Sequence, residues 1–185
     1  MATTDGTLKG RLAGDLDRAF PDLVAEMQGA VFNGARRWLP SRQDAEDVAQ
    51  EVFVRAYQAL QGYSVERIGA LRLRPWLFTI TLNLCRNHAR TRSRRPNQVV
   101  LDGRDAPGSD AVEHSAVDAV AVDEWKGRLA QLTQGQREAI VLRHVVGLRY
   151  NEIGEVLERK TGTVKSDVHR GLERLRTILA TEELQ

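Results

Sequence analysis

Apolar side chains recur every three or four residues along nearly the whole chain, and this periodicity restricts the fold more than any other feature. The segment from Asp44 to Leu60 shows it most clearly, with apolar residues at 45, 48, 49, 52, 53, 56, 57 and 60. This spacing places the apolar side chains on one stripe of a helix. The sequence lacks the two-residue alternation of half-buried strands, so it predicts an all-α fold.

Two further helices are expected, one on each side of this segment. The first covers about residues 21–39 and stops at Pro40. The other begins at Pro75, a favoured first helical position, and runs to Pro96. Ser41 is placed to cap the central helix, whose first turn is acidic. The stretch "QGYSVERIGALRLR" contains two glycines and predicts a loop before the third helix.

The segment 96–124 differs from its surroundings in composition. It holds seven acids, one arginine and no aromatic residue, whereas residues 86–95 hold five arginines and no acid. This composition predicts a flexible acidic linker, with helix only near its end. The chain is therefore expected to form two small helical domains, residues 1–95 and residues 125–185.

Cysteine and histidine usage argues against a catalytic or metal-binding protein. Cys85 is the only cysteine, which excludes an internal disulfide and a Cys-rich zinc site, and its apolar neighbours predict a buried side chain. The four histidines are scattered, and neither an HExxH motif nor a glycine-rich phosphate loop is present. We expect no enzymatic activity, no metal and no cofactor.

The chain also lacks the patterns of membrane and secreted proteins. Its first twenty residues contain no apolar core of signal-peptide length, and no apolar run approaches the roughly 20 residues needed to span a bilayer. A soluble cytoplasmic protein without membrane insertion is expected.

The second domain carries the pattern of a helix-turn-helix. Thr133 and Gln136 form a capping-box pair before an apolar helix that Gly147 ends. A short helix over residues 150–158 follows, and after a tight turn a longer one carries apolar residues at 164, 168, 172, 175 and 179. Such a pair of helices is typical of DNA-binding domains, although helical hairpins without DNA function are also common.

Four segments resemble one known family. "LTQGQREAIVLRHVVGLRYNEIGEVL" and "GTVKSDVHRGLERLR" are similar to the C-terminal promoter-binding domain of bacterial extracytoplasmic-function (ECF) sigma factors. "DAEDVAQEVFVRAYQAL" and "RPWLFTITLNLCRNHARTRSRR" resemble the N-terminal domain of that family, in the same order. The resemblance covers about residues 19–179. It implies a non-enzymatic protein that binds core RNA polymerase, recognises the −35 and −10 promoter elements and helps to melt the latter.

The resemblance gives a role to the polar side of the helix that ends at Leu60. In the family this helix docks on a coiled coil of the largest polymerase subunit, with polar contacts around an apolar centre. For an anonymous helix the same side chains would form an ordinary solvated face. The residues expected to bind polymerase are Asp44, Asp47, Gln50, Glu51 and Arg55.

The helix that begins at Pro75 is expected to engage the −10 element. The family uses it, with the loop before it, to capture a flipped base of the non-template strand. An asparagine offers both a donor and an acceptor to a base edge, and arginines neutralise phosphates, although the basic run could serve only solubility. The expected residues are Asn83, Asn87, His88, Arg90, Arg92 and Arg94.

The last helix is expected to read the −35 element in the major groove. Lysine and arginine suit guanine and phosphates, and serine is permissive. The resemblance implies contacts from Arg149, Lys165, Ser166, His169, Arg170 and Arg174.

Asp167 stands where the family usually has a basic residue. It could pair with Arg170 or Arg174 along the helix, accept a hydrogen bond from a cytosine amino group, or weaken non-specific DNA binding. Its position beside the groove-facing line favours pairing together with weaker non-specific binding. The turn "LERKTG" also departs from the family pattern, and its added cations could offset Asp167.

Two other functions compete with the sigma-factor interpretation. A stand-alone helix-turn-helix regulator would explain residues 125–185 but not the first domain. A polymerase-binding adaptor without promoter specificity would explain both domains and the presence of Asp167. The expected partners are core RNA polymerase, promoter DNA and an anti-sigma protein. The linker acids could mimic a nucleic-acid backbone inside polymerase or simply be exposed to solvent.

Overall fold

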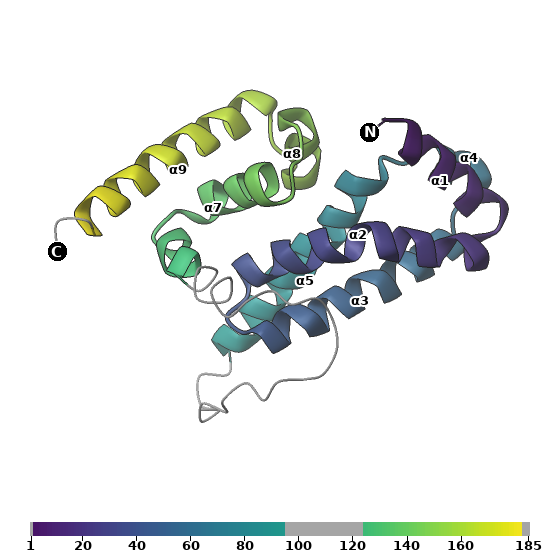
Figure 1. Cartoon of the computed structure of the whole chain (residues 1–185), viewed down its shortest axis with the longest axis horizontal. Helices are drawn as coiled ribbons and strands as arrows, with labels where there is room; N and C mark the ends of the chain where they lie inside the picture. The colour runs from purple at the N-terminus through teal and green to yellow at the C-terminus, as the bar shows by residue number, and fades with distance from the viewer. Residues whose placement is uncertain (1, 95–123, 183–185) are drawn as a thin grey trace.

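A computed structural model describes residues 2–94 and 124–182 of the 185-residue chain. These residues form helices, and no strand occurs among them, which confirms the all-α prediction (Figure 1). The helices are α1 (Ala2–Gly14), α2 (Leu16–Trp38), α3 (Arg42–Gln61), α4 (Val65–Ala70), α5 (Leu73–Arg94), α7 (Gln134–Ile140), the π-helical turn η1 (Val141–Val145), α8 (Tyr150–Leu157) and α9 (Thr161–Glu182). Residues 124–130 are also helical, whereas most of the predicted linker lies outside the described residues.

Side-chain caps begin several of these helices where the sequence predicted them. The Ser41 hydroxyl accepts a hydrogen bond from the backbone N–H of Asp44 at 3.0 Å, at the start of α3. Thr133 and Gln136 form the reciprocal capping box at the start of α7. Each cap satisfies a backbone donor that the first helical turn leaves unpaired.

Other boundaries differ from the predictions. α2 begins five residues before Pro21, because Asp15 caps it and accepts from the N–H of Arg18 at 3.1 Å. α5 begins at Leu73, so Pro75 occupies its first turn, where a missing N–H costs no helical hydrogen bond. The predicted loop contains the short helix α4, and α1 was not predicted at all.

The first domain packs α1, α2, α3, α4 and α5 around a common core. α2 lies against α3, α3 against α5, and α1 against α4 (Figure 1). Leu8 and Leu12 of α1 are buried, which explains why this polar-looking N-terminal segment folds. Among the described residues, no helix is long and apolar enough to cross a membrane.

The second domain holds the helix-turn-helix formed by α8 and α9, with α7 packed along α9. Gly171 permits the close approach of α7 and α9, because a Cβ at this position would collide with the Ile140 side chain. Leu129, Val141, Leu175 and other apolar residues fill a small core between these helices.

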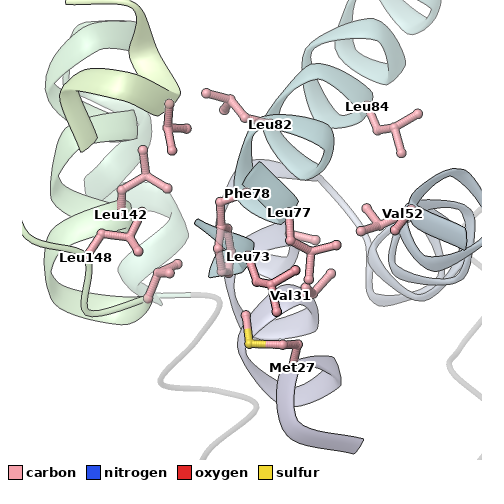
Figure 2. Close-up of a cluster of buried hydrophobic side chains, with 14 of the residues drawn as sticks. Met27, Val31, Val52, Leu73, Leu77, Phe78, Leu82, Leu84, Leu142 and Leu148 are labelled. Carbon is pink, nitrogen blue, oxygen red and sulfur yellow. The ribbon is translucent and has the colours of Figure 1, made fainter. Parts of the chain in front are cut away.

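The two domains meet through apolar side chains. Phe78 and Leu82 of α5 face Leu142 and Leu148 of the second domain (Figure 2), and all four belong to one buried cluster. Residues far apart in the sequence therefore share a core, and the two domains pack directly against each other in a closed arrangement.

Cys85 is buried in α5, as predicted. Burial raises the pKa of its thiol to about 12, so the nucleophilic thiolate is scarce at neutral pH. We expect the folded chain to resist iodoacetamide at pH 8, while the chain unfolded in guanidinium is alkylated at the rate of a free thiol. Mass spectrometry of both samples measures this. Equal modification rates in the two samples would contradict the burial of Cys85.

Candidate nucleic-acid and protein interfaces

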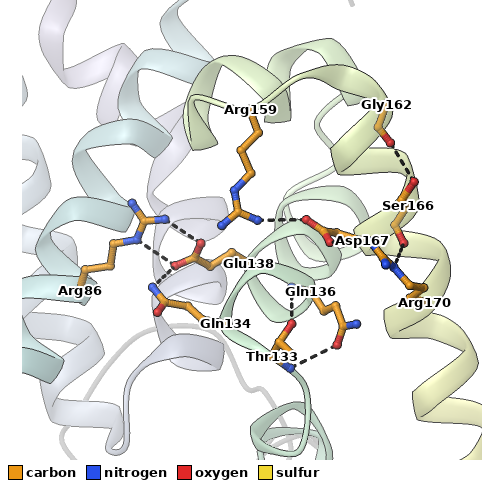
Figure 3. Close-up of polar contacts among 10 residues, drawn as sticks. All are labelled: Arg86, Thr133, Gln134, Gln136, Glu138, Arg159, Gly162, Ser166, Asp167 and Arg170. Atoms are coloured by element: carbon orange, nitrogen blue, oxygen red, sulfur yellow. Dashed lines mark hydrogen bonds and ion pairs between the residues drawn. The ribbon is translucent and has the colours of Figure 1, made fainter.

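The exposed side of α9 gathers hydrogen-bond donors and cations. Lys165, Ser166, His169 and Arg170 are exposed, while Val164 and Val168 point into the core. The Ser166 hydroxyl donates to the carbonyl of Gly162 at 3.1 Å, and Arg170 Nε donates to the carbonyl of Ser166 at 3.4 Å (Figure 3). The structure thus places these four predicted DNA-binding residues on one face of one helix.

The other two residues predicted to contact the −35 element, Arg149 and Arg174, are not part of this group of four. Arg149 immediately precedes α8, and its side chain is 74% exposed. Its guanidinium donates to Glu152 at 2.9 Å, which raises the pKa of Arg149. Arg174 follows Arg170 by one helical turn and borders a small cavity beside Gln131.

The turn between α8 and α9 is tight and depends on one glycine. Glu158 adopts the left-handed conformation, with φ of 53°, and caps α8. The N–H of Arg159 then donates to the carbonyl of Gly154 at 2.9 Å. A Cβ on Gly154 would lie 2.8 Å from the carbonyl oxygen of Arg159, so any larger residue there would displace the turn.

Asp167 is almost enclosed, with a side chain 15% exposed. One carboxylate oxygen lies 3.0 Å from Arg159 Nη1, and the other lies 3.6 Å from Arg170 Nη2 (Figure 3). The predicted pairing of Asp167 with Arg170 is therefore confirmed, at the longer of the two distances. The closer partner, Arg159, comes from the turn, and helical spacing within α9 could not have identified it.

The polar residues of α5 lie on two different faces. Asn83, Asn87 and Arg90 are exposed on one face. His88 and Arg92 face α3 instead. His88 Nε2 lies 3.1 Å from one carboxylate oxygen of Asp44, and Arg92 Nη1 lies 3.6 Å from the other. This follows from helical geometry, because five residues along a helix correspond to about 140° of rotation. Arg94 ends α5, but its side chain lies outside the described part.

An aromatic cluster lies beside the Asn83 face. The sequence placed Trp76 on this side of the helix and favoured a core position for it, and the side chain is partly buried against the core. The Tyr63 and Trp76 ring centroids are 6.2 Å apart, and the Arg67 guanidinium lies 3.6 Å from the Tyr63 centroid. Trp76 precedes Asn83 by seven residues, so the two share a side of α5. The sequence signal for this cluster was the four-residue spacing of Tyr63 and Arg67, which flank the helix cap Ser64.

The polar side of α3 borders an apolar groove. Asp47, Gln50 and Arg55 are exposed, and Arg55 donates to Glu51 at 2.6 Å. Gln50 also lines a groove of about 680 Å³ between α2 and α3. The apolar residues of this groove are Val24, Phe32, Ala49 and Phe53.

Ion pairs reinforce the contact between the two domains. Arg86 of α5 donates to both carboxylate oxygens of Glu138, at 2.8 and 2.7 Å, and the Glu138 side chain is only 4% exposed (Figure 3). Hydrogen bonding by Glu138 raises the pKa of Arg86. Arg72 pairs with Glu152 at 2.9 Å and also with Glu155.

A cavity of about 350 Å³ lies between the domains. Its lining includes Trp38 and Cys85 from the first domain and Glu138 from the second. Arg90 also borders it, so the same residue adjoins both the Asn83 face and the domain contact.

Comparisons with known proteins agree on one family. The family model for Sigma-70 region 2 matches residues 23–95, and the model for Sigma-70, region 4 matches residues 124–175. The chain is 33% identical over 165 residues to the RNA polymerase sigma-H factor of Pseudomonas aeruginosa, covering 84% of this chain and 83% of that protein. It is 33% identical over 175 residues to the ECF RNA polymerase sigma factor SigW of Bacillus subtilis, covering 88% and 89%.

A solved structure shows the same arrangement of helices. The structure of CnrH in complex with the cytosolic domain of CnrY matches with a TM-score of 0.73 and 27% sequence identity. The match covers 96% of this chain and 97% of CnrH.

Proposed function

Because the chain belongs to the ECF sigma factors of the sigma-70 family, which direct core RNA polymerase to specific promoters, we propose that three surfaces divide this work. α3 holds polymerase, α5 with the preceding turn engages the −10 element, and α9 reads the −35 element. One observation carries the division: the region 4 match extends to residue 175 and so includes the part of α9 whose exposed face gathers Lys165, Ser166, His169 and Arg170.

The polymerase contact combines the groove and its polar border. Val24, Phe32 and Phe53 supply the apolar centre that a helical partner needs, and Gln50 supplies a polar contact at the groove. Asp47 and Glu51 extend the polar contacts along α3. Asp44 contributes indirectly, because its carboxylate faces His88 and Arg92 of α5. The ion pair of Arg55 with Glu51 links two side chains one helical turn apart on the polar side of α3.

The −10 contact combines stacking with hydrogen bonding. Tyr63 and Trp76 offer aromatic faces to an unstacked base, and Arg67 adds a cation above Tyr63. Asn83 and Asn87 offer amide donors and acceptors from the adjacent exposed face. Arg90 supplies positive charge to the DNA backbone on this face, and Arg92 and Arg94 add positive charge further along α5. His88 contacts Asp44 on the side of α5 that faces α3.

Simultaneous contact with both elements requires the two domains to separate. The elements are about 25 base pairs apart, or roughly 85 Å at about 3.4 Å per base pair. Residues 95–123 can span at most about 95 Å when fully extended. We therefore regard the closed arrangement, in which the two domains touch, as the DNA-free state. The proposed boundaries are residues 1–95 for the first domain, 96–124 for the tether and 125–185 for the second domain.

An anti-sigma protein is the proposed negative regulator, by analogy with CnrH, whose structure contains the cytosolic domain of CnrY. The chain itself acts in the cytoplasm, without catalytic activity or cofactor. A stand-alone regulator remains a poorer account, because it gives no role to the region 2 match or to the groove.

Asn83→Ala is expected to slow open-complex formation about tenfold, because one base-edge interaction contributes roughly 1–2 kcal/mol. The assay uses polymerase holoenzyme on a promoter recovered from a randomised library, with 2-aminopurine fluorescence reporting strand separation. A premelted template is the control, since it removes the need for base capture and should restore most of the activity. An unchanged rate on duplex DNA would remove Asn83 from the −10 interface.

A further inference from the structure

We propose that Asp167 is a positioning residue of the −35 interface, whose carboxylate joins Arg159 of the turn to Arg170 of α9 and so sets how strictly α9 discriminates DNA sequences. The inference rests on the proposed function of α9. It assigns the acid a favourable role in a surface where a negative charge would otherwise only oppose phosphate binding.

The geometry separates Asp167 from direct base contact. Its side chain is 15% exposed, and each carboxylate oxygen faces a different guanidinium, at 3.0 Å for Arg159 and 3.6 Å for Arg170. A carboxylate enclosed in this way is satisfied inside the protein. Its effect on DNA must therefore pass through the two arginines.

Asp167 and the two arginines form a bridge, Arg159–Asp167–Arg170. Its Arg159 end contacts three helices. The backbone of Arg159 closes the turn after α8 through its hydrogen bond to the carbonyl of Gly154. Its guanidinium extends across the first turn of α7, where a Cβ on Gly135 would collide with it. The same guanidinium then reaches Asp167 on α9 (Figure 3). Asp167 thereby links α9 to the turn after α8 and, through the Arg159 side chain, to the start of α7.

The Arg170 end is part of the exposed face. The Arg170 side chain is 62% exposed, and it is held between the carbonyl of Ser166 and the Asp167 carboxylate. A guanidinium in a fixed orientation can match the acceptors of one base, whereas a freely rotating one binds any nearby phosphate. Because the Arg170 side chain is already ordered before DNA binds, less conformational entropy is lost on binding.

A rival explanation treats Asp167 only as a negative charge near DNA. In that case Asp167→Asn strengthens binding to all DNA, Arg159→Gln weakens it, and the double variant shows the sum of the two effects. The bridge predicts otherwise. Both single variants lose discrimination, and the double variant loses no more than the worse single one, because the interaction is already broken.

The experiment uses holoenzyme reconstituted from the full chain and core polymerase. Wild type first enriches a −35 sequence from a randomised promoter pool, and the ratio of Kd values for scrambled and enriched sequences is then measured. We expect this ratio to fall about tenfold for Asp167→Asn, for Arg159→Gln and for the double variant, which is comparable to one mismatched base pair. Glu182→Gln, which removes the same charge from the far end of α9, should retain the wild-type ratio.

Rescue separates positioning from a loss of folding. Asp167→Glu keeps the carboxylate within reach of Arg159 and should restore most of the ratio, with thermal denaturation confirming folding of every variant. Additive effects of opposite sign, or an unchanged ratio in Asp167→Asn, would overturn the bridge alone. Failure of the wild-type holoenzyme to enrich any −35 sequence would overturn the proposed function of α9 and this inference with it.

Discussion

Reversing two charges on α3, by Asp47→Arg together with Glu51→Arg, is expected to lower the affinity for core RNA polymerase by about 100-fold or more. Asp47 is exposed and Glu51 is partly exposed, and both lie on the polar side of α3, the helix that forms one wall of the groove. Like charges facing each other across an interface cost several kcal/mol, which corresponds to a loss of this size. Fluorescence anisotropy of the labelled chain, titrated with core polymerase, measures the change.

A matched control distinguishes this local effect from a change in net charge. Glu26→Arg with Glu66→Arg makes the same total change at exposed positions of α2 and α4 that lie neither on α3 nor in the lining of the groove. This control should bind polymerase within about threefold of wild type, in line with the small effects of charges outside an interface. Circular dichroism should show both variants to be folded. Wild-type affinity in the α3 variant would remove this surface from the polymerase interface.

Glu138→Ala is expected to destabilise the described fold by about 3–5 kcal/mol, the cost of leaving one member of a buried ion pair alone. Glu138 is 4% exposed and receives two hydrogen bonds from Arg86, whose side chain is 29% exposed. Removing the carboxylate leaves a half-buried guanidinium between the two domains without its partner. Guanidinium denaturation of the full chain, followed by circular dichroism, measures the loss.

Two further variants make this prediction specific. Glu155→Ala removes a 51%-exposed partner of Arg72 at the same domain contact and should cost less than about 1 kcal/mol. Arg86→Met combined with Glu138→Leu replaces the ion pair by apolar side chains and should recover most of the stability. If Glu138→Ala unfolds at the wild-type denaturant concentration, the ion pair does not stabilise the domain contact.

The sequence predicted those parts of the fold that depend on local chemistry. Periodic apolar residues identified α3, and Ser41 and Thr133 marked the starts of α3 and α7, because caps act within one helical turn. α4 escaped prediction because six residues are too few to show a period. α1 escaped because its burial depends on α4, which lies fifty residues further along the chain.

The candidate surfaces show the same difference between features set within one helix and features that depend on distant residues. Lys165, Ser166, His169 and Arg170 share one helix, so spacing alone placed them on a common face. His88 and Asp44 belong to different helices, and their contact at 3.1 Å could not be read from either segment. The sequence indicated that cations of the turn could offset Asp167, but it could not show that Arg159 pairs with it directly, because the shape of this turn depends on Gly154 and on the left-handed Glu158.

Run-off transcription with purified core polymerase tests the central claim, that two linked helical domains carry one polymerase to one class of promoter. With the full chain added, discrete transcripts should appear from a promoter library, and the initiating templates should share sequence at both −35 and −10. The Asp47→Arg, Glu51→Arg variant should give none of these transcripts. Unaltered transcription on adding the wild-type chain, or start sites with no common sequence at either element, would contradict the account.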